Sequence, residues 1–109
     1  MARLTADFWV AAYRARLEAL GIPVYISRRG DATAGAVLVK LATLDGQARL
    51  YGRMSTLEGA QLWEVVAEGP EPEVDAAAAR AHARDPDLWL VEVEDRQGRH
   101  LLDDAGFSG

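Results

Sequence analysis

The segment "AVLVKLATLDGQARLYGR", residues 36–53, constrains the fold most, because it predicts two antiparallel strands joined by a tight turn. Two runs rich in apolar and β-branched residues flank Asp45-Gly46, a dipeptide typical of a two-residue type I′ turn. With that turn, Leu41 faces Leu50 and one face of the hairpin is apolar. The other face then carries the polar and charged residues of the hairpin: Lys40, Arg49, Tyr51 and Arg53.

Two helices are expected, one before and one after the hairpin in the sequence. Thr5 is the expected N-cap of a first helix that begins near Ala6, and Gly21 followed by Pro23 ends it. Apolar residues follow the helical period between these points. The second helix is expected over 73–85, where an alanine-rich segment begins with acidic residues, as the helix dipole favours.

Three further strands complete the expected sheet. Residues 22–29 and 88–94 have the β-branched and aromatic content of strands. Residues 61–68 are ambiguous between a strand and a short helix, and their alternation favours a strand. The order α-β-β-β-β-α-β predicts an α+β, two-layer domain, in which a mostly antiparallel sheet of about four to five strands carries both helices on one face. One domain is expected over 1–109, with 103–109 a frayed tail.

The charge of the chain is unevenly placed, and this bounds its partners. The net charge is −5 over 109 residues, divided as +4 in residues 1–53 and −9 in residues 54–109. An acidic chain repels a polyanion at long range, so nucleic acid is disfavoured. The absence of cysteine excludes disulfides, thiolate nucleophiles and Cys-ligated metals. The N-terminal segment has the pattern of neither a signal peptide nor a membrane span, so a soluble cytoplasmic protein without membrane contact is expected.

The cations of the hairpin allow two interpretations. In the first, they pair with carboxylates of later strands, such as Glu68 and Glu92, and the sheet face is self-complementary. In the second, they bind phosphate or nucleic acid together with two arginines before the glycine-flanked loop "GDATAG", whose amides could face an anion. The candidate anion-binding residues are Arg28, Arg29, Lys40, Arg49 and Arg53. The candidates for stacking or for contact with a partner are Tyr51, Trp63 and Trp89.

Few residues suggest catalysis. His82 and His100 are the only histidines, and neither has a spacing from carboxylates that favours a metal site. The order of elements is similar to the core of restriction-endonuclease-like nucleases, but the acidic and Glu-x-Lys elements of those sites are absent. We therefore predict no catalytic residue, no metal site and no cofactor. The alternative is a metal-dependent phosphoesterase that uses the basic hairpin face, with Glu92 or Glu94 as metal ligand.

Three blocks in the same order carry a resemblance to a known family: "FWVAAYRARLEALG", "RRGDATAGAVLVKLATLDGQARLYG" and "DPDLWLVEVEDRQGRHLLD". They cover nearly the whole chain, which resembles DUF1491, a family of small bacterial proteins of unknown function. The resemblance implies a single free-standing cytoplasmic domain and carries over no site. We predict a non-enzymatic binding or regulatory domain that acts through contacts with a protein partner. A homodimer is a further possibility, since an edge strand offers backbone groups to a second copy.

Overall fold

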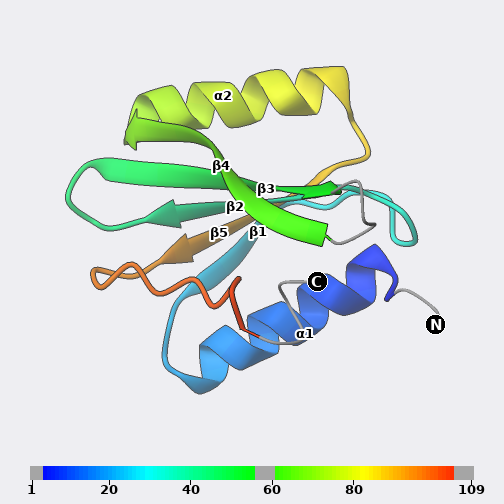
Figure 1. Cartoon of the computed structure of the whole chain (residues 1–109), viewed down its shortest axis with the longest axis horizontal. Helices are drawn as coiled ribbons and strands as arrows, with labels where there is room; N and C mark the ends of the chain where they lie inside the picture. Colours follow the sequence, from blue (N-terminus) through cyan, green and yellow to red (C-terminus); the bar gives the residue numbers. More distant parts are fainter. Residues whose placement is uncertain (1–3, 56–60, 105–109) are drawn as a thin grey trace.

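The computed structural model describes residues 4–55 and 61–104, which form two helices and one five-stranded sheet (Figure 1). The elements are α1 (Ala6–Ala19), β1 (Val24–Arg28), β2 (Val37–Ala42), β3 (Gln47–Ser55), β4 (Gln61–Pro70), α2 (Glu71–Arg84) and β5 (Trp89–Glu94). This confirms the α+β class and the order expected from the sequence, with a strand rather than a helix over 61–68. No helix in these two stretches is long and apolar enough to cross a membrane.

The sheet is mixed, with the strand order β1-β5-β2-β3-β4. The last strand, β5, lies between β1 and β2, parallel to β2 and antiparallel to β1. The pairs β2 with β3 and β3 with β4 are antiparallel, so β1 and β4 form the edges. Because β5 is an interior strand, its alternate side chains Trp89, Val91 and Val93 are buried.

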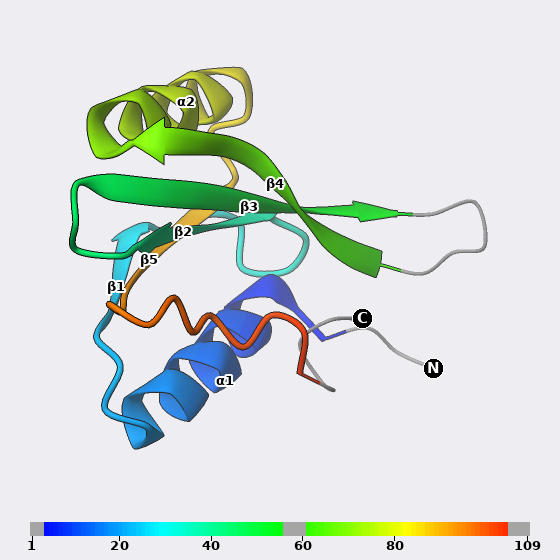
Figure 2. The same ribbon diagram turned by 60° about the vertical axis from the view of Figure 1, so that its left-hand side comes forward.

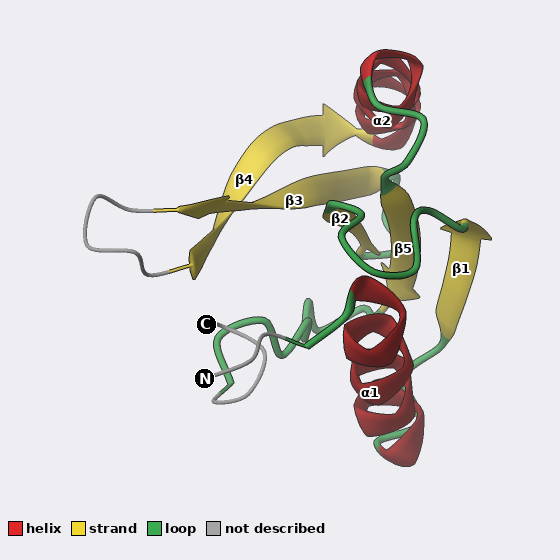
Figure 3. Ribbon diagram, turned by 90° about the vertical axis from the view of Figure 1, so that its right-hand side faces the viewer, coloured by secondary structure: helices red, strands yellow, loops and turns green. Residues whose placement is uncertain are grey.

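The two helices cover opposite faces of the sheet, and the expectation that both lie on one face is wrong (Figures 2 and 3). Val39 and Leu41 of β2 pack in the cluster that contains α1, whereas Leu38 packs against the cluster that contains α2. The reason lies in the sequence of β2, VLVKLA: Val39 and Leu41 need cover on one face, and Leu38 and Ala42, on either side of Lys40, need it on the other. We call the two faces the α1 side and the α2 side.

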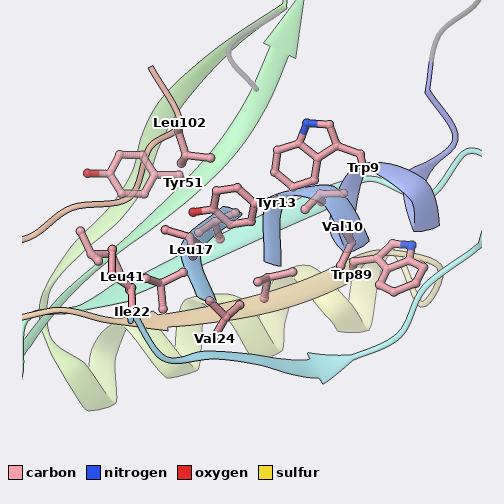
Figure 4. Packing of buried hydrophobic residues seen from close by; sticks show 14 of the residues in the cluster. Trp9, Val10, Tyr13, Leu17, Ile22, Val24, Leu41, Tyr51, Trp89 and Leu102 are labelled. Carbon is pink, nitrogen blue, oxygen red and sulfur yellow. The ribbon is translucent and has the colours of Figure 1, made fainter. Parts of the chain in front are cut away.

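The larger core lies on the α1 side (Figure 4). Trp9, Tyr13 and Leu17 recur at helical spacing along α1 and point towards the sheet, where Val91 and Val93 are fully buried. The core on the α2 side is built from smaller groups: Ala48, Leu50, Val74 and Ala78. The two sides therefore differ in the size of the side chains that hold the helix to the sheet.

Both ends of α1 are fixed by backbone hydrogen bonds. Thr5 is the N-cap residue as expected, but its hydroxyl donates to Asp7 instead of capping the backbone. The first amides of α1 donate to the carbonyls of Ala32 and Thr33, in the loop before β2. At the other end, Gly21 has a φ of 76°, and the amides of Gly21 and Ile22 donate to the carbonyls of Glu18 and Leu17, which is a Schellman motif at the predicted helix end.

The register of the β2–β3 hairpin differs by one residue from the expected one. Leu41 lies opposite Arg49, and Lys40 lies opposite Leu50. The turn has three residues rather than two, because the Thr43 amide donates to the Gln47 carbonyl at 3.3 Å. A shift of one residue moves a side chain to the other face of the sheet. The prediction that the hairpin cations share one face is therefore wrong for Lys40, which lies on the α2 side.

The distal parts of β3 and β4 form a two-stranded ribbon that extends beyond β2 (Figure 3), and its α1 side contacts α1 through Trp9. A β-bulge lies within this pair: Leu50 is opposite Ala67, but Tyr51 is opposite Val65, so Val66 has no counterpart. The bulge adds one residue to β4 and allows neighbouring apolar residues to face solvent on different sides.

The chain after β5 returns along the α1 side of the sheet. Leu102, near the end of the described part, is fully buried in the α1-side core. The predicted frayed tail begins at Asp103, and most of it, residues 105–109, lies outside the described residues.

Candidate functional site

Lys40 lies on the α2 side among three carboxylates, two from α2 and one from β5. Its Nζ atom lies 2.7 Å from Glu71, 2.6 Å from Asp75 and 3.2 Å from Glu92. The residue is only 3 % exposed. Burial alone would lower the pKa of Lys40, but the hydrogen bonds to Asp75 and Glu71 and the charge of Glu92 outweigh it and hold the pKa above its ordinary value. Lys40 is therefore a protonated cation that ties α2 to the sheet.

Arg49 lies on the α1 side and pairs with the neighbouring edge strand. Its Nε atom lies 3.1 Å from Oε2 of Glu68, and both side chains are exposed. A hydrogen bond with Tyr51 and the negative charge of Glu68 raise the pKa of Arg49. Lys40 and Arg49 are therefore each matched by a carboxylate of a later strand, as in the first interpretation, but the two pairs lie on opposite faces of the sheet.

Arg53 is held between two indole rings. The carbon at the centre of its guanidinium lies 5.1 Å from the ring centroid of Trp9 and 4.9 Å from that of Trp63. The two indoles are 5.3 Å apart, and Trp9 also stacks on Tyr13 with ring centroids 4.8 Å apart. A row of aromatic rings therefore runs from the α1-side core to the exposed Arg53, whose cation–π contacts limit its freedom.

Tyr51 belongs to the core rather than to the surface. Its ring lies against the imidazole of His100, with centroids 4.7 Å apart, and the residue is buried. The Nδ1 atom of His100 accepts a hydrogen bond from the Leu102 amide at 3.0 Å, and its carbonyl accepts one from the Tyr13 hydroxyl at 2.6 Å. Burial lowers the pKa of His100. These contacts fasten the chain after β5 onto the α1 side.

The glycine-flanked loop before β2 uses its amides within the protein. The amides of Thr33 and Ala34 donate to Oδ2 of Asp31, at 3.2 and 2.8 Å. The amide of Asp31 donates to the carbonyl of Asp87, and that of Gly35 donates to the carbonyl of Asp31. Four of the six amides of the loop 30–35 therefore already donate within the protein.

The remaining candidates, Arg28, Arg29 and Trp89, lie near this loop. They belong to β1, to the residue after it and to β5, which are separated from β3 and β4 by β2 in the sheet. Arg28 ends β1, and the Arg29 guanidinium carbon lies 5.1 Å from the ring centroid of Trp89. Trp89 itself is buried, and its Nε1 donates to the Asp31 carbonyl at 2.9 Å. The structure thus brings Arg49, Tyr51, Arg53 and Trp63 together on the α1 side of β3 and β4, and separates them from Arg28, Arg29, Lys40 and Trp89.

The sequence analysis missed the apolar exposure of β4. Leu62, Val65 and Val66 are 49 %, 43 % and 50 % exposed. With Arg53 and the half-buried Trp63 they form what we call the ribbon surface. The signal is present in "LWEVVAE", because two adjacent valines point to opposite faces of a strand and one sheet face cannot bury both.

Carboxylates do not gather into a metal site in the described part of the chain. Within residues 4–55 and 61–104, no group of three or more His, Cys, Asp or Glu side chains could hold a metal ion. The carboxylates of Glu71, Asp75 and Glu92 instead surround the ammonium of Lys40.

The model of the family described as "Protein of unknown function (DUF1491)" matches residues 4–103. The chain belongs to the DUF1491 family. A search of curated proteins gives no match for this DUF1491 protein.

Solved structures confirm both family and fold. The crystal structure of a DUF1491 family protein from Caulobacter crescentus CB15 is 45 % identical, with a TM-score of 0.86 over 92 % of this chain and 95 % of that one. The NMR structure of a DUF1491 family protein from the same organism is 44 % identical, with a TM-score of 0.81 over 92 % and 93 %. The solution structure of protein Atu0922 from A. tumefaciens is 28 % identical, with a TM-score of 0.73 over 85 % and 86 %.

Proposed function

We propose that this DUF1491 protein is a non-enzymatic binding domain, and that its partner is an extended segment of another protein that pairs with the outer edge of β4. The observation that carries the proposal is the exposure of Leu62, Val65 and Val66 on one edge strand. A projecting two-stranded ribbon buries little apolar surface by itself. A long edge strand with apolar side chains is a template on which a further strand can form.

The aromatic and arginine content of the ribbon supports protein binding. Tryptophan and arginine are enriched among the residues that dominate protein interfaces. Arg53 already lies between the indoles of Trp9 and Trp63, so it loses little conformational freedom when a partner covers it. A partner strand beside β4 would lie next to Trp63 and Val65 on the α1 side.

The charges of β4 favour a basic partner over a second copy. Glu64 is exposed on the α2 side of the ribbon, opposite Gly52, and a cross-strand neighbour of a glutamate is best a lysine or arginine. The net charge of −5 acts in the same direction at long range. Antiparallel pairing with a second copy, centred on Val66, would place Glu64 opposite Glu68 of that copy, where like charges repel. The partner segment is therefore apolar and basic.

The phosphoesterase alternative lacks a common site. It requires Glu92 or Glu94 beside the hairpin cations, but both glutamates lie on the α2 side, where Lys40 is the hairpin cation and its ammonium already contacts Glu71, Asp75 and Glu92. Arg49 lies on the α1 side, as does Arg53. The sheet separates the would-be metal ligands from these arginines, which supports binding over phosphoester hydrolysis.

A displayed library of random nine-residue segments tests this proposal. Selection on the intact protein should enrich segments in which β-branched or aromatic residues alternate with lysine or arginine. NMR titration with an enriched peptide should shift the amide signals of residues 62–66. The charge-reversing variant Glu64→Lys should select segments with acidic residues in place of basic ones. The matched control Glu73→Lys, on α2, should select the same segments as the wild type.

Two results would reject the proposal. In the first, selection on the wild type enriches no segments beyond those enriched by the double variant Leu62→Lys/Val65→Lys, in which only exposed side chains are changed. The other is a dimer in sedimentation experiments whose amide protection falls on β4, which would make a second copy the partner.

A further inference from the structure

A groove of about 320 Å³ lies on the α2 side, between the second half of α2 and the sheet. Its floor is formed by side chains of β2, β3 and β4, and one wall by α2. The lining residues are Leu38, Leu50, Val66, Ala77, Arg80, Ala81 and Arg84. The volume is at the lower end of the range of small-molecule sites, about 300 to 1,000 Å³.

The groove exists because the residues on both of its sides are small. Ala77 and Ala81 are the residues that α2 turns towards it, one helical turn apart. On the sheet, Gly52 has no side chain: a Cβ there would lie 3.3 Å from Val66 and 3.4 Å from Leu38. The leucine and valine side chains therefore close over the glycine and form an apolar floor, while the alanines leave space above it.

Two arginines of α2 border this apolar floor. Arg80 and Arg84 are one helical turn apart and exposed, and neither has a carboxylate at ion-pair distance among the described residues. Arg49 and Arg99, in contrast, each pair with a carboxylate. Like charges at this spacing on a helix repel each other. An anion between the two guanidinium groups would relieve that repulsion.

We propose that this groove binds an anionic amphiphile, an unbranched aliphatic carboxylate of medium length. The aliphatic chain lies on Leu38, Leu50 and Val66, and the carboxylate pairs with Arg80 and Arg84. The argument is one of complementarity: apolar surface faces the chain, and two unpaired cations face the charge. The groove lies on the face of the sheet opposite Arg53 and Trp63 and shares Val66 alone with the ribbon surface, and the proposal does not rest on the proposed function.

Titration of the intact protein with sodium decanoate, followed by NMR, tests this site. Saturable shifts are expected in the methyl signals of Leu38, Leu50 and Val66. The double variant Arg80→Gln/Arg84→Gln should weaken binding by about tenfold or more, because charge-assisted hydrogen bonds are lost. The matched control Arg14→Gln/Arg16→Gln removes the same charge from α1, on the other side of the sheet, and should leave the affinity unchanged.

Two further measurements separate the chain from the charge. Ala81→Leu fills the groove from the helix side and should abolish decanoate binding while the rest of the NMR spectrum shows a folded protein. Decanol, which has the same chain without the charge, should bind about tenfold more weakly. The proposal fails if decanoate gives no saturable shift up to about 1 mM, if the arginine variant binds as well as the wild type, or if Ala81→Leu still binds. It also fails if the shifts map to a different surface.

Discussion

The two sides of the sheet hold their helices by different means. On the α1 side, Trp9, Tyr13 and Leu17 fill the space between helix and sheet with large apolar groups. On the α2 side the apolar contacts are small, and Lys40 binds two carboxylates of the helix in addition. Helix α1 is therefore held mainly by the packing of large apolar side chains. Helix α2 is held by ion pairs to the buried Lys40 together with small apolar side chains.

The largest effect is expected in the α1-side core. Leu17→Ala removes a fully buried side chain from a tightly filled space, so the free energy of unfolding should fall by about 3 kcal/mol. The corresponding change on the α2 side, Val74→Ala, removes two carbons and should cost about 1.5 kcal/mol. Urea denaturation of both variants measures the difference. Equal losses would show that volume matters as much on the α2 side, against the contrast drawn here.

The second effect concerns the buried cation. Lys40→Met removes the positive charge at the centre of Glu71, Asp75 and Glu92, so their carboxylates repel one another. The loss of stability should be about 2 kcal/mol, below the value for fully buried pairs because the carboxylates keep contact with water. Denaturation by urea at neutral pH gives the value.

A second substitution distinguishes repulsion among the carboxylates from the loss of hydrogen bonds in the network. Lys40→Met/Glu92→Gln removes one of the unmatched carboxylate charges and should recover part of the stability lost in Lys40→Met. If the double variant is less stable than the single one, charge repulsion is not the cause, and the network is held by hydrogen bonds to Glu92 instead.

These two regions also show what the sequence can and cannot predict. The periodicity of α1 and its Gly21 stop signal correctly predicted a helix whose large apolar stripe is buried. Nothing local indicated that β5 inserts between β1 and β2, since strand order depends on contacts far apart in sequence. The two-sided apolar run in β2 was the missed sign that helices cover both faces.

The faces on which the candidate site residues lie depend on the register of the β2–β3 hairpin, which differs by one residue from the expected one. The dipeptide Asp45-Gly46 suggested a two-residue turn, but Oδ1 of Asp45 accepts hydrogen bonds from the Thr43 hydroxyl and the Gln47 amide, at 2.6 and 3.1 Å, and supports a three-residue turn. That difference transferred Lys40 to the α2 side and left Arg49 on the α1 side. The sequence correctly indicated a hairpin rich in cations, but it wrongly predicted that Lys40 and Arg49 lie on the same face.

A smaller effect, in mild acid, is expected from the α1 side. Burial lowers the pKa of His100 in the folded protein, whereas the unfolded chain keeps a value of about 6.5. The unfolded state therefore binds more protons as the pH falls through this value, and stability decreases. Thermal unfolding at pH 7.5 and 5.5 should show a larger decrease for the wild type than for His100→Gln. His82→Gln, which changes the other histidine, should retain the wild-type decrease, and a decrease that survives in His100→Gln would assign it to other groups.

The smallest effect is expected for Arg49, and the reason is its contrast with Lys40. Both cations lie about 3 Å from a carboxylate, but Lys40 is buried whereas Arg49 and Glu68 are both exposed. Exposed pairs gain little, because water screens them and two long side chains must be ordered. Arg49→Ala should therefore lower the urea midpoint of unfolding far less than Lys40→Met does. Added salt screens the exposed pair, so at high salt Arg49→Ala and the wild type should have the same midpoint. Urea denaturation of the two variants at low and high salt makes the comparison. A loss for Arg49→Ala as large as that for Lys40→Met would mean that burial does not decide the strength of these ion pairs, and that Arg49 stabilises the edge of the sheet through its contact with Tyr51.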